Sequence, residues 1–268
     1  MNASIQSSYN ENGYYIFDRS VLTPDLVAAA LEAMDMLRMG GEDTGTPIDK
    51  SHWKPGDDPA ALCKIDYPQI ASKVMRQFIG SPEIGECAAA ATGARMVQAW
   101  AVQLLYKPPS SADTTAPTNV GWHQDWNYWN TTWEESSELL TAWVALSDIT
   151  ADSGPMKFVQ RSHQWNDVGG GDFFSQDVDI NTFSVPDGEQ WHEVPALMPA
   201  GGLSLHHNRT LHGSGPNTSS SPRCSVAIHL RTDKSRAREG GRAEHAKHID
   251  DLTLSPINYG ERVESAFD

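Results

Sequence analysis

Cysteine is scarce in this sequence. Its 268 residues include only three cysteines, Cys63, Cys87 and Cys224, and no two of them form a CxxC pair. An odd and scattered set of thiols does not make the paired framework of a small disulfide-stabilised secreted domain. Free buried thiols are typical of a reducing compartment, so the sequence predicts a cytoplasmic protein.

Long apolar runs and positive charge are lacking as well. No segment approaches the roughly 18 to 20 apolar residues of a membrane-spanning helix, and residues 1–12 carry no basic and then apolar signal pattern. Acidic residues outnumber basic ones by 35 to 20, which gives a net charge of −15. Because nothing in this balance neutralises phosphates, we expect no nucleic-acid partner, and because no apolar span is present we expect no membrane partner.

The chain shows no internal repeat and no linker that would divide it. Thr23 caps a predicted helix that starts with Pro24 and Asp25, and apolar positions recur at helical spacing until Gly40. From residue 96, short β-like runs alternate with loops, as in a sandwich or barrel. We therefore predict one α+β domain over residues 1–268, with a helical part over about 1–95, a mainly β core over about 96–233 and a C-terminal tail over 234–268.

His123 and Asp125 form an HxD pair within Gly121-Trp122-His123-Gln124-Asp125-Trp126. On an extended backbone, residues two apart point to the same side, so both side chains can contact one metal ion. A second histidine from another strand would complete the facial triad of two histidines and one carboxylate that marks non-haem iron(II) oxygenases. The HxD pair alone is weak support for a metal site.

A second motif lies about 90 residues further along the chain. His212 stands among turn-forming residues in Leu211-His212-Gly213-Ser214-Gly215-Pro216-Asn217, and Arg223 follows eleven positions later. The planar guanidinium of an arginine makes bidentate, charge-assisted hydrogen bonds and is a natural partner for a dicarboxylate. Ser225 shares the strand face of Arg223, so its hydroxyl is a candidate donor to the same carboxylate.

Several motifs in fixed order carry a resemblance to a known family over roughly residues 9–233. They are Asn12-Gly13-Tyr14-Tyr15-Ile16, Gln103 to Pro109, Trp122-His123-Gln124-Asp125, Ala142 to Leu146, Asp152 to Met156, and His212-Gly213-Ser214 with Arg223. Together they resemble the phytanoyl-CoA dioxygenase-like (PhyH) family of Fe(II)/2-oxoglutarate-dependent oxygenases. One departure is Gln160-Arg161-Ser162-His163, where the family usually reads Pro-Gly-Ser-His, and this leaves the turn geometry open.

The resemblance implies a fold, a reaction and a set of roles. The fold is a double-stranded β-helix, a jelly-roll or cupin-like barrel, flanked by N-terminal helices. Iron(II) is held by His123, Asp125 and His212, and 2-oxoglutarate by Arg223 and Ser225, with Gln103, Trp143 and Lys64 lining its pocket. The implied reaction consumes O2 and 2-oxoglutarate, releases succinate and CO2, and hydroxylates a C–H bond of a small organic substrate. We expect a monomer or homodimer.

The remaining histidines and aromatic residues give further expectations. His206 and His207 are adjacent, so one must face away, and neither precedes a Gly-Ser turn; His212 is therefore preferred as the ligand. His229 shares strand parity with Arg223 and is expected near the pocket. Four aromatic residues follow the HxD pair and are candidates for a substrate wall or for the hydrophobic core: Trp126, Tyr128, Trp129 and Trp133. The loops at 108–119 and 165–190, the latter with Gly169-Gly170-Gly171, are long enough to cover a site.

Two other functions stay open at this point. One is a metalloenzyme on the same barrel that uses no cosubstrate, and the other is a non-catalytic small-molecule binder that has kept the fold. Arg223 separates the first from an oxygenase, because only the oxygenase needs it to bind 2-oxoglutarate. The complete set of metal ligands disfavours the second.

Overall fold

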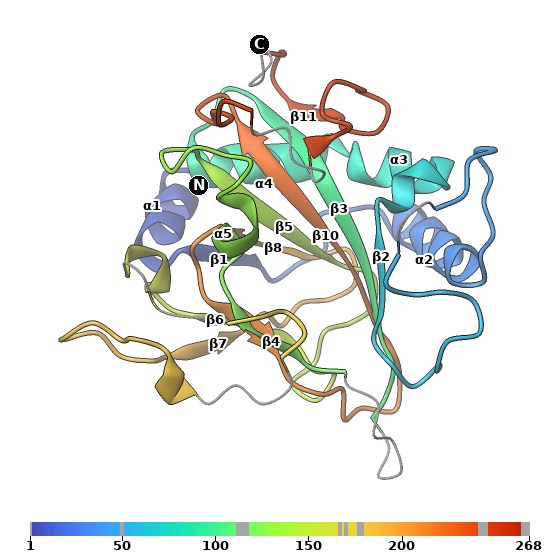
Figure 1. Cartoon of the computed structure of the whole chain (residues 1–268), viewed down its shortest axis with the longest axis horizontal. Coiled ribbons are helices and arrows are strands. Elements are labelled where there is room, and N and C mark those ends of the chain that lie inside the picture. The colour runs from blue at the N-terminus through green and yellow to red at the C-terminus, as the bar shows by residue number, and fades with distance from the viewer. Residues whose placement is uncertain are drawn as a thin grey trace.

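The fold consists of two antiparallel β-sheets packed face to face, seen in a computed structural model that describes residues 2–48, 51–110, 118–165, 168, 171–175, 180–240 and 246–263 (Figure 1). The larger sheet has the order β1 (Tyr14–Phe17), β8 (Leu203–His207), β5 (Leu139–Ala145), β10 (Arg223–Thr232), β3 (Val97–Lys107) and β11 (Ile257–Tyr259), and β2 (Cys63–Asp66) also pairs with β3. The smaller sheet has the order β4 (Val120–His123), β9 (His212–Ser214), β6 (Met156–Val159) and β7 (Glu193–Pro195). This confirms the predicted jelly-roll.

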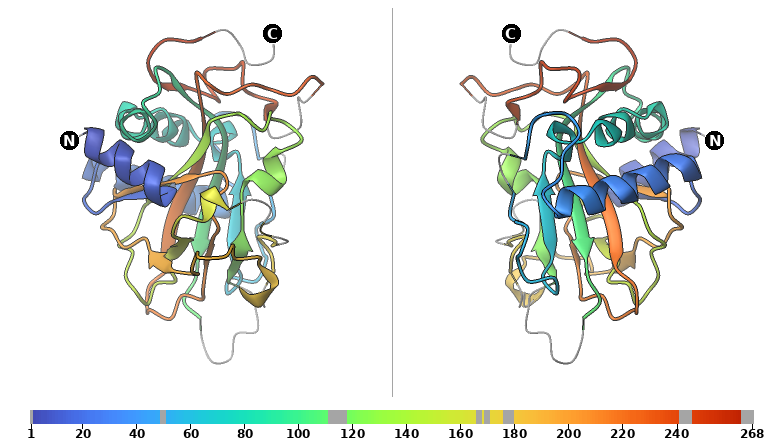
Figure 2. Two further views of the ribbon diagram at one scale, coloured as in Figure 1. Left: turned by 90° about the vertical axis from the view of Figure 1, so that its left-hand side faces the viewer. Right: turned by 90° about the vertical axis from the view of Figure 1, so that its right-hand side faces the viewer.

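Helices cover the outer face of the larger sheet (Figure 2). They are α1 (Asn2–Asn12), α2 (Pro24–Arg38), α3 (Lys73–Ile79) and α4 (Pro82–Thr92). The short η1 (Pro68–Ile70), whose Ile70 packs in a different apolar cluster, α5 (Trp126–Trp129), η2 (Ser162–Gln164) and η3 (Ile180–Thr182) lie in connections. The predicted cap is present, since Thr23 accepts a hydrogen bond from the Leu26 amide. Within the described ranges, no helix is both long and apolar enough to cross a lipid bilayer.

The central strands of the larger sheet are buried on both faces: one face packs against the helices and the other faces the smaller sheet. Along β10, Val226 and Ile228 pack in the same apolar cluster as helix residues, whereas Ala227 packs in a second cluster between the sheets. Because side chains alternate along a strand, Arg223 and His229 point with Ala227 into the space between the sheets. Polar residues on an otherwise apolar strand are thereby placed inside the barrel.

The N-terminal helix α1 was not predicted, because residues 2–12 are polar and lack an apolar stripe. Ile5 and Tyr9 are nonetheless buried in the cluster shared with the other helices, and α1 packs against α4. Two apolar residues at i and i+4 are enough to stabilise a polar segment as a helix when a neighbouring helix covers them. Gly13 follows with a left-handed φ of 83°, and its amide donates to the Tyr9 carbonyl to end the helix.

The expected C-terminal tail takes part in the larger sheet. Its strand β11 pairs with β3, and the Gln98 side chain on β3 donates to the carbonyls of Ile249 and Ser255. A charged composition did not reveal this pairing, because the strand is only three residues long. The tail therefore completes one edge of the sheet.

The turn after β6 keeps its geometry despite a residue that disfavours it. Arg161 stands where the related motif has glycine, and its φ of 67° lies in the left-handed region that strains any residue with a Cβ. The turn is fixed by its neighbours: the Ser162 hydroxyl donates to the Val159 carbonyl and accepts from the Leu211 amide. These bonds connect the turn to β9 directly before His212.

We expect Arg161→Gly to unfold at a higher temperature than Arg161→Ala. Both variants lose the ion pair of Arg161 with Glu189, but only glycine relieves the left-handed strain. The expected difference in melting temperature is about 2–4 °C for a domain of this size, measured by circular dichroism. Equal melting temperatures would show that this backbone position is not strained.

Candidate metal centre and cosubstrate site

Two strands of the smaller sheet place the two predicted histidine ligands side by side. His123 ends β4 and His212 begins β9, and the two residues are register partners in the antiparallel pair. Directly opposed residues point to the same face of a sheet, so the rings lie with centroids 4.2 Å apart. Asp125 follows two residues later, at the start of α5. The fold therefore brings all three residues together around one point.

Both imidazole rings present a free nitrogen. Nδ1 of His123 lies 2.7 Å from the Gly121 carbonyl oxygen, and Nδ1 of His212 lies 2.9 Å from the Thr210 carbonyl oxygen. A carbonyl oxygen only accepts, so each Nδ1 carries the proton and each Nε2 keeps its lone pair. Burial lowers the pKa of both histidines to about 4, which keeps them neutral at neutral pH. Two neutral Nε2 atoms are suitable metal ligands.

The two carboxylate oxygens of Asp125 have different surroundings. Oδ1 lies 3.9 Å from Nε2 of His123 and 3.8 Å from Nε2 of His212. Oδ2 accepts a hydrogen bond of 2.8 Å from the Thr141 hydroxyl and lies 3.3 Å from Nε2 of His206. Burial alone raises the pKa of Asp125, but the neighbouring histidines outweigh it and hold the pKa below its ordinary value. Oδ1 is therefore the oxygen left for a metal.

The donor set fits iron. The ligand atoms of His123, Asp125 and His212 all lie within 4.8 Å of one another, and no other group of this kind occurs in the described parts of the chain. Two imidazoles and one carboxylate on one side of an ion are the facial arrangement of non-haem iron(II) oxygenases. The outer contacts of all three residues are satisfied, as such sites require: two backbone carbonyls and one threonine hydroxyl hold them.

Arg223 lies in the same cavity. Its guanidinium is a buried positive charge for which the described residues provide no anion. Arg223 is 2% exposed, its guanidinium lies 5.2 Å from the centre of the Trp143 ring, and it donates to the Gly154 carbonyl at 3.0 Å. Its Nε has no hydrogen-bond partner, and no carboxylate among the described residues forms an ion pair with it. Burial lowers its pKa to about 10, so the charge persists at neutral pH. Such a group calls for an anionic ligand.

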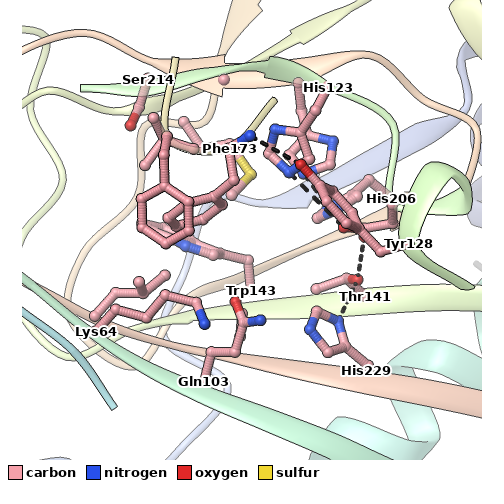
Figure 3. Close-up of a pocket in the computed structure, with 18 of the residues that line it drawn as sticks. Lys64, Gln103, His123, Tyr128, Thr141, Trp143, Phe173, His206, Ser214 and His229 are labelled. Atoms are coloured by element: carbon pink, nitrogen blue, oxygen red, sulfur yellow. Dashed lines mark hydrogen bonds and ion pairs between the residues drawn. The ribbon is translucent and has the colours of Figure 1, made fainter. Parts of the chain in front are cut away.

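Three of the four other predicted cosubstrate residues line the cavity. Lys64, Gln103 and Trp143 line the cavity along the larger sheet, opposite His123 (Figure 3). Lys64 is also paired with Asp66 at 2.6 Å. Ser225 faces the same side of β10 as Arg223 and is fully buried, and its hydroxyl has no hydrogen-bond partner among the described residues, but it is not one of the residues that line the cavity.

Ser214 is a second hydroxyl residue near Arg223 that was not predicted as a site residue. It lies on β9 two residues after His212 and lines the cavity together with Arg223. The spacing was visible in the sequence as His212-Gly213-Ser214, since residues two apart on a strand share a face. What the sequence did not reveal is how deeply the larger sheet buries Ser225.

Only two of the four aromatic residues that were expected as a substrate wall line the cavity. Tyr128 and Trp129 line the cavity, whereas Trp133 is fully buried in a core cluster 5.4 Å from the Trp100 ring. Trp126 lies beneath the Arg209 guanidinium, 4.8 Å away, and does not face the cavity. The single helical turn of α5 causes this division, because it sends consecutive side chains in different directions.

Besides Ser214, several cavity residues were not predicted as site residues, among them His52, Thr141, Met156, Phe173 and Phe174. The two phenylalanines come from the second of the two loops that were expected to be long enough to cover a site. The Gly121 amide donates to the Phe173 carbonyl, and a Cβ on either Gly121 or Gly171 would collide with the opposite backbone. The loop therefore lies directly against β4. Gly169 and Gly170 fall outside the described residues.

The other histidines fall mostly where they were expected. His206 faces the cavity and His207 faces away from it, toward His163. His229 reaches the cavity and lies 2.9 Å from the Thr141 hydroxyl. His245 lies outside the described residues.

Comparison with known proteins agrees with this geometry. The sequence profile of a family described as Phytanoyl-CoA dioxygenase (PhyH) matches residues 9–225. The chain belongs to this family. A relative in Stutzerimonas stutzeri, described as a probable alpha-ketoglutarate-dependent hypophosphite dioxygenase, is 26% identical over 229 residues, which cover 82% of this chain and 74% of the relative.

Solved structures show the same fold. The epimerase SnoN from nogalamycin biosynthesis, in complex with Fe3+, alpha ketoglutarate and nogalamycin RO, is 25% identical with a TM-score of 0.67, covering 91% of this chain and 88% of that one. The alpha ketoglutarate dependent carbocyclase SnoK is 24% identical with a TM-score of 0.69, covering 95% of each chain. With its family and its His-Asp-His site, the protein is an iron- and 2-oxoglutarate-dependent dioxygenase.

Replacing Thr141 by valine is expected to weaken metal binding. The variant keeps the shape of the side chain but removes the hydroxyl that holds Oδ2 of Asp125. Loss of such an outer contact lowers metal affinity about 10- to 100-fold, measurable by titrating the metal-free protein with iron(II) under anaerobic conditions. Thr132→Val is a matched control, because its buried hydroxyl has no partner. Equal affinities in the two variants would contradict this role of Thr141.

The metal-free protein should lose stability as the pH falls from 6.5 toward 4. His123 and His212 have a pKa of about 4 in the fold, against 6.5 when unperturbed. Within this window the unfolded chain binds more protons, so stability rises with pH and falls with acid. Urea denaturation across the range measures the effect. His212→Asn removes one of the two titrating groups, so its free energy of unfolding should decrease less over this pH range. A decrease identical to that of the unchanged protein would show that His212 does not have a lowered pKa in the fold.

Proposed function

We propose that this protein hydroxylates a C–H bond of a small, partly apolar organic molecule. The observation that carries the proposal is one cavity that holds both a three-residue metal site and a buried arginine without an anion. A non-catalytic binder needs neither, and a metalloenzyme without a cosubstrate has no use for the arginine. Both together are what 2-oxoglutarate requires, with its keto acid end at the metal and its far carboxylate at a cation.

Each residue then has a defined task. His123, Oδ1 of Asp125 and His212 hold the iron, which supplies activation of O2 coupled to oxidation of 2-oxoglutarate. Arg223 binds the far carboxylate, and Ser214 beside it offers a hydroxyl. Three further residues along the larger sheet complete the cosubstrate pocket: Lys64, Gln103 and Trp143.

Aromatic residues support a partly apolar substrate. Tyr128 and Phe173 lie against the His123 ring at 5.9 and 5.6 Å, and Phe174 lies 5.1 Å from the His52 ring. The Phe173 amide donates to the Tyr128 hydroxyl at 2.9 Å, which joins the loop to α5 above the iron ligands. Aromatic walls of this kind bury apolar surface. Phe174 is 53% exposed, so it marks the rim of the cavity.

The reaction balances as follows. One oxygen atom of O2 enters the substrate C–H bond and forms an alcohol, and the other enters succinate as 2-oxoglutarate loses CO2. The solved relatives include an epimerase and a carbocyclase, whose products do not gain an oxygen atom. Incubation under 18O2, with mass spectrometry of substrates that stimulate succinate release, therefore decides between these outcomes. A product without the label would overturn hydroxylation.

Arg223→Met should abolish productive binding of 2-oxoglutarate. Removing one partner of a buried charge pair costs about 2–5 kcal/mol, which raises the KM for 2-oxoglutarate by at least tenfold in a succinate-release assay. Arg231→Met is a matched control, since this arginine lies on the same strand, is 3% exposed and does not line the cavity. An unchanged KM in the Arg223 variant would show that Arg223 does not bind the far carboxylate of 2-oxoglutarate.

A further inference from the structure

A second buried cation lies directly beside the proposed carboxylate site. Lys107 ends β3 and is the register partner of Arg223 on β10. Its side chain is fully buried, and no carboxylate in the described parts of the chain pairs with it. Like charges directly opposite each other on neighbouring strands destabilise a sheet, and burial increases the cost. The pair is costly unless a bound anion lies between or beside the two charges.

The ammonium of Lys107 is held by two hydrogen bonds. Its Nζ donates to the Ser214 hydroxyl oxygen at 2.6 Å and to the Gly215 carbonyl at 2.6 Å. The backbone is fixed as well, because the buried Asn217 side chain donates to the Lys107 carbonyl at 3.2 Å. Lys107 does not line the cavity, whereas Ser214 and Arg223 do. Any effect of Lys107 on a ligand must therefore pass through Ser214 or act through its charge.

The bond to Ser214 settles the direction of a hydroxyl. Because the Ser214 oxygen accepts from Lys107, its own hydrogen must point away from the ammonium. No acceptor for this hydrogen is present among the described residues. A carboxylate bound to Arg223 would supply one, and it would accept a charge-assisted hydrogen bond.

We propose that Lys107 is a positioning residue that turns the Ser214 hydroxyl toward the far carboxylate of 2-oxoglutarate and, once that carboxylate is bound, carries a second positive charge at that end. The inference rests on the proposed binding of 2-oxoglutarate to Arg223. It assigns selectivity for 2-oxo dicarboxylates over 2-oxo monocarboxylates to three groups in series: an ammonium, a hydroxyl and a guanidinium. A 2-oxo acid without the far carboxylate gains nothing from them.

The test compares two ligands in the iron-loaded protein under anaerobic conditions. Binding of 2-oxoglutarate and of 2-oxobutyrate, which lacks the far carboxylate, is followed by the visible absorption that a 2-oxo acid produces on chelating iron(II). Lys107→Met keeps the length of the side chain and removes its charge. We expect the Kd for 2-oxoglutarate to rise about 10- to 100-fold and the Kd for 2-oxobutyrate to stay unchanged.

A purely structural role of Lys107 gives a different result, because a distorted site loses affinity for both ligands equally. That outcome, or an unchanged Kd for 2-oxoglutarate, would overturn the inference. Lys157→Met is the control for charge, since it removes a half-exposed lysine from β6 outside the cavity. Should Lys107→Met not fold, Ser214→Ala decides in its place: it must reproduce the loss for 2-oxoglutarate alone, and an unchanged Kd refutes the inference.

Arg223→Met separates this inference from the function on which it rests. If it leaves 2-oxoglutarate binding unchanged, the proposed cosubstrate site is wrong and the role of Lys107 fails with it. If it removes binding while Lys107→Met and Ser214→Ala do not weaken it, only the role of Lys107 is wrong. The double variant of Lys107 and Ser214 should lose little more than either single variant, because the two residues act in series.

Discussion

The active site depends on the register of one short antiparallel pair. β4 and β9 place His123 opposite His212, and this single pairing brings together ligands that lie far apart in the sequence. The backbone also fixes the proton on each ring, since carbonyls beside both Nδ1 atoms leave both Nε2 atoms free. A slip of one residue would turn one imidazole to the opposite face of the sheet. Metal binding is therefore a property of strand pairing before it is a property of side chains.

The larger sheet contributes charge rather than metal ligands. Arg223 and Lys107 are buried side by side without a carboxylate of the protein to balance them, and burial together with the charge of Arg223 lowers the pKa of Lys107 well below its ordinary value. Such an arrangement reduces the stability of the empty protein and favours an anionic ligand. In the proposed function, the smaller sheet supplies both histidine ligands of the metal, and the larger sheet supplies most of the cosubstrate pocket, Arg223 included.

Local sequence patterns predicted the elements of the fold well where the pattern is regular. The α2 helix with its Thr23 cap and the long strands β3 and β10 were visible because apolar periodicity and turn residues mark them. The first helix and the last strand were not, because each depends on one neighbouring element and carries few apolar residues. Arg161 shows the same limit, since its strained conformation is imposed by hydrogen bonds of the turn and not by its own preference.

The sequence by itself determined the chemistry: which histidines, which carboxylate and which arginine are available, and that their spacing matches one family. Only the tertiary structure decided which hydroxyl and which aromatic rings reach the cavity. The residues that line the cavity are Ser214 rather than Ser225, and Tyr128 and Trp129 rather than Trp126 and Trp133. The physical reason is that strand parity and helical turns give the direction of a side chain, but only the packing of the second sheet gives the space that it faces.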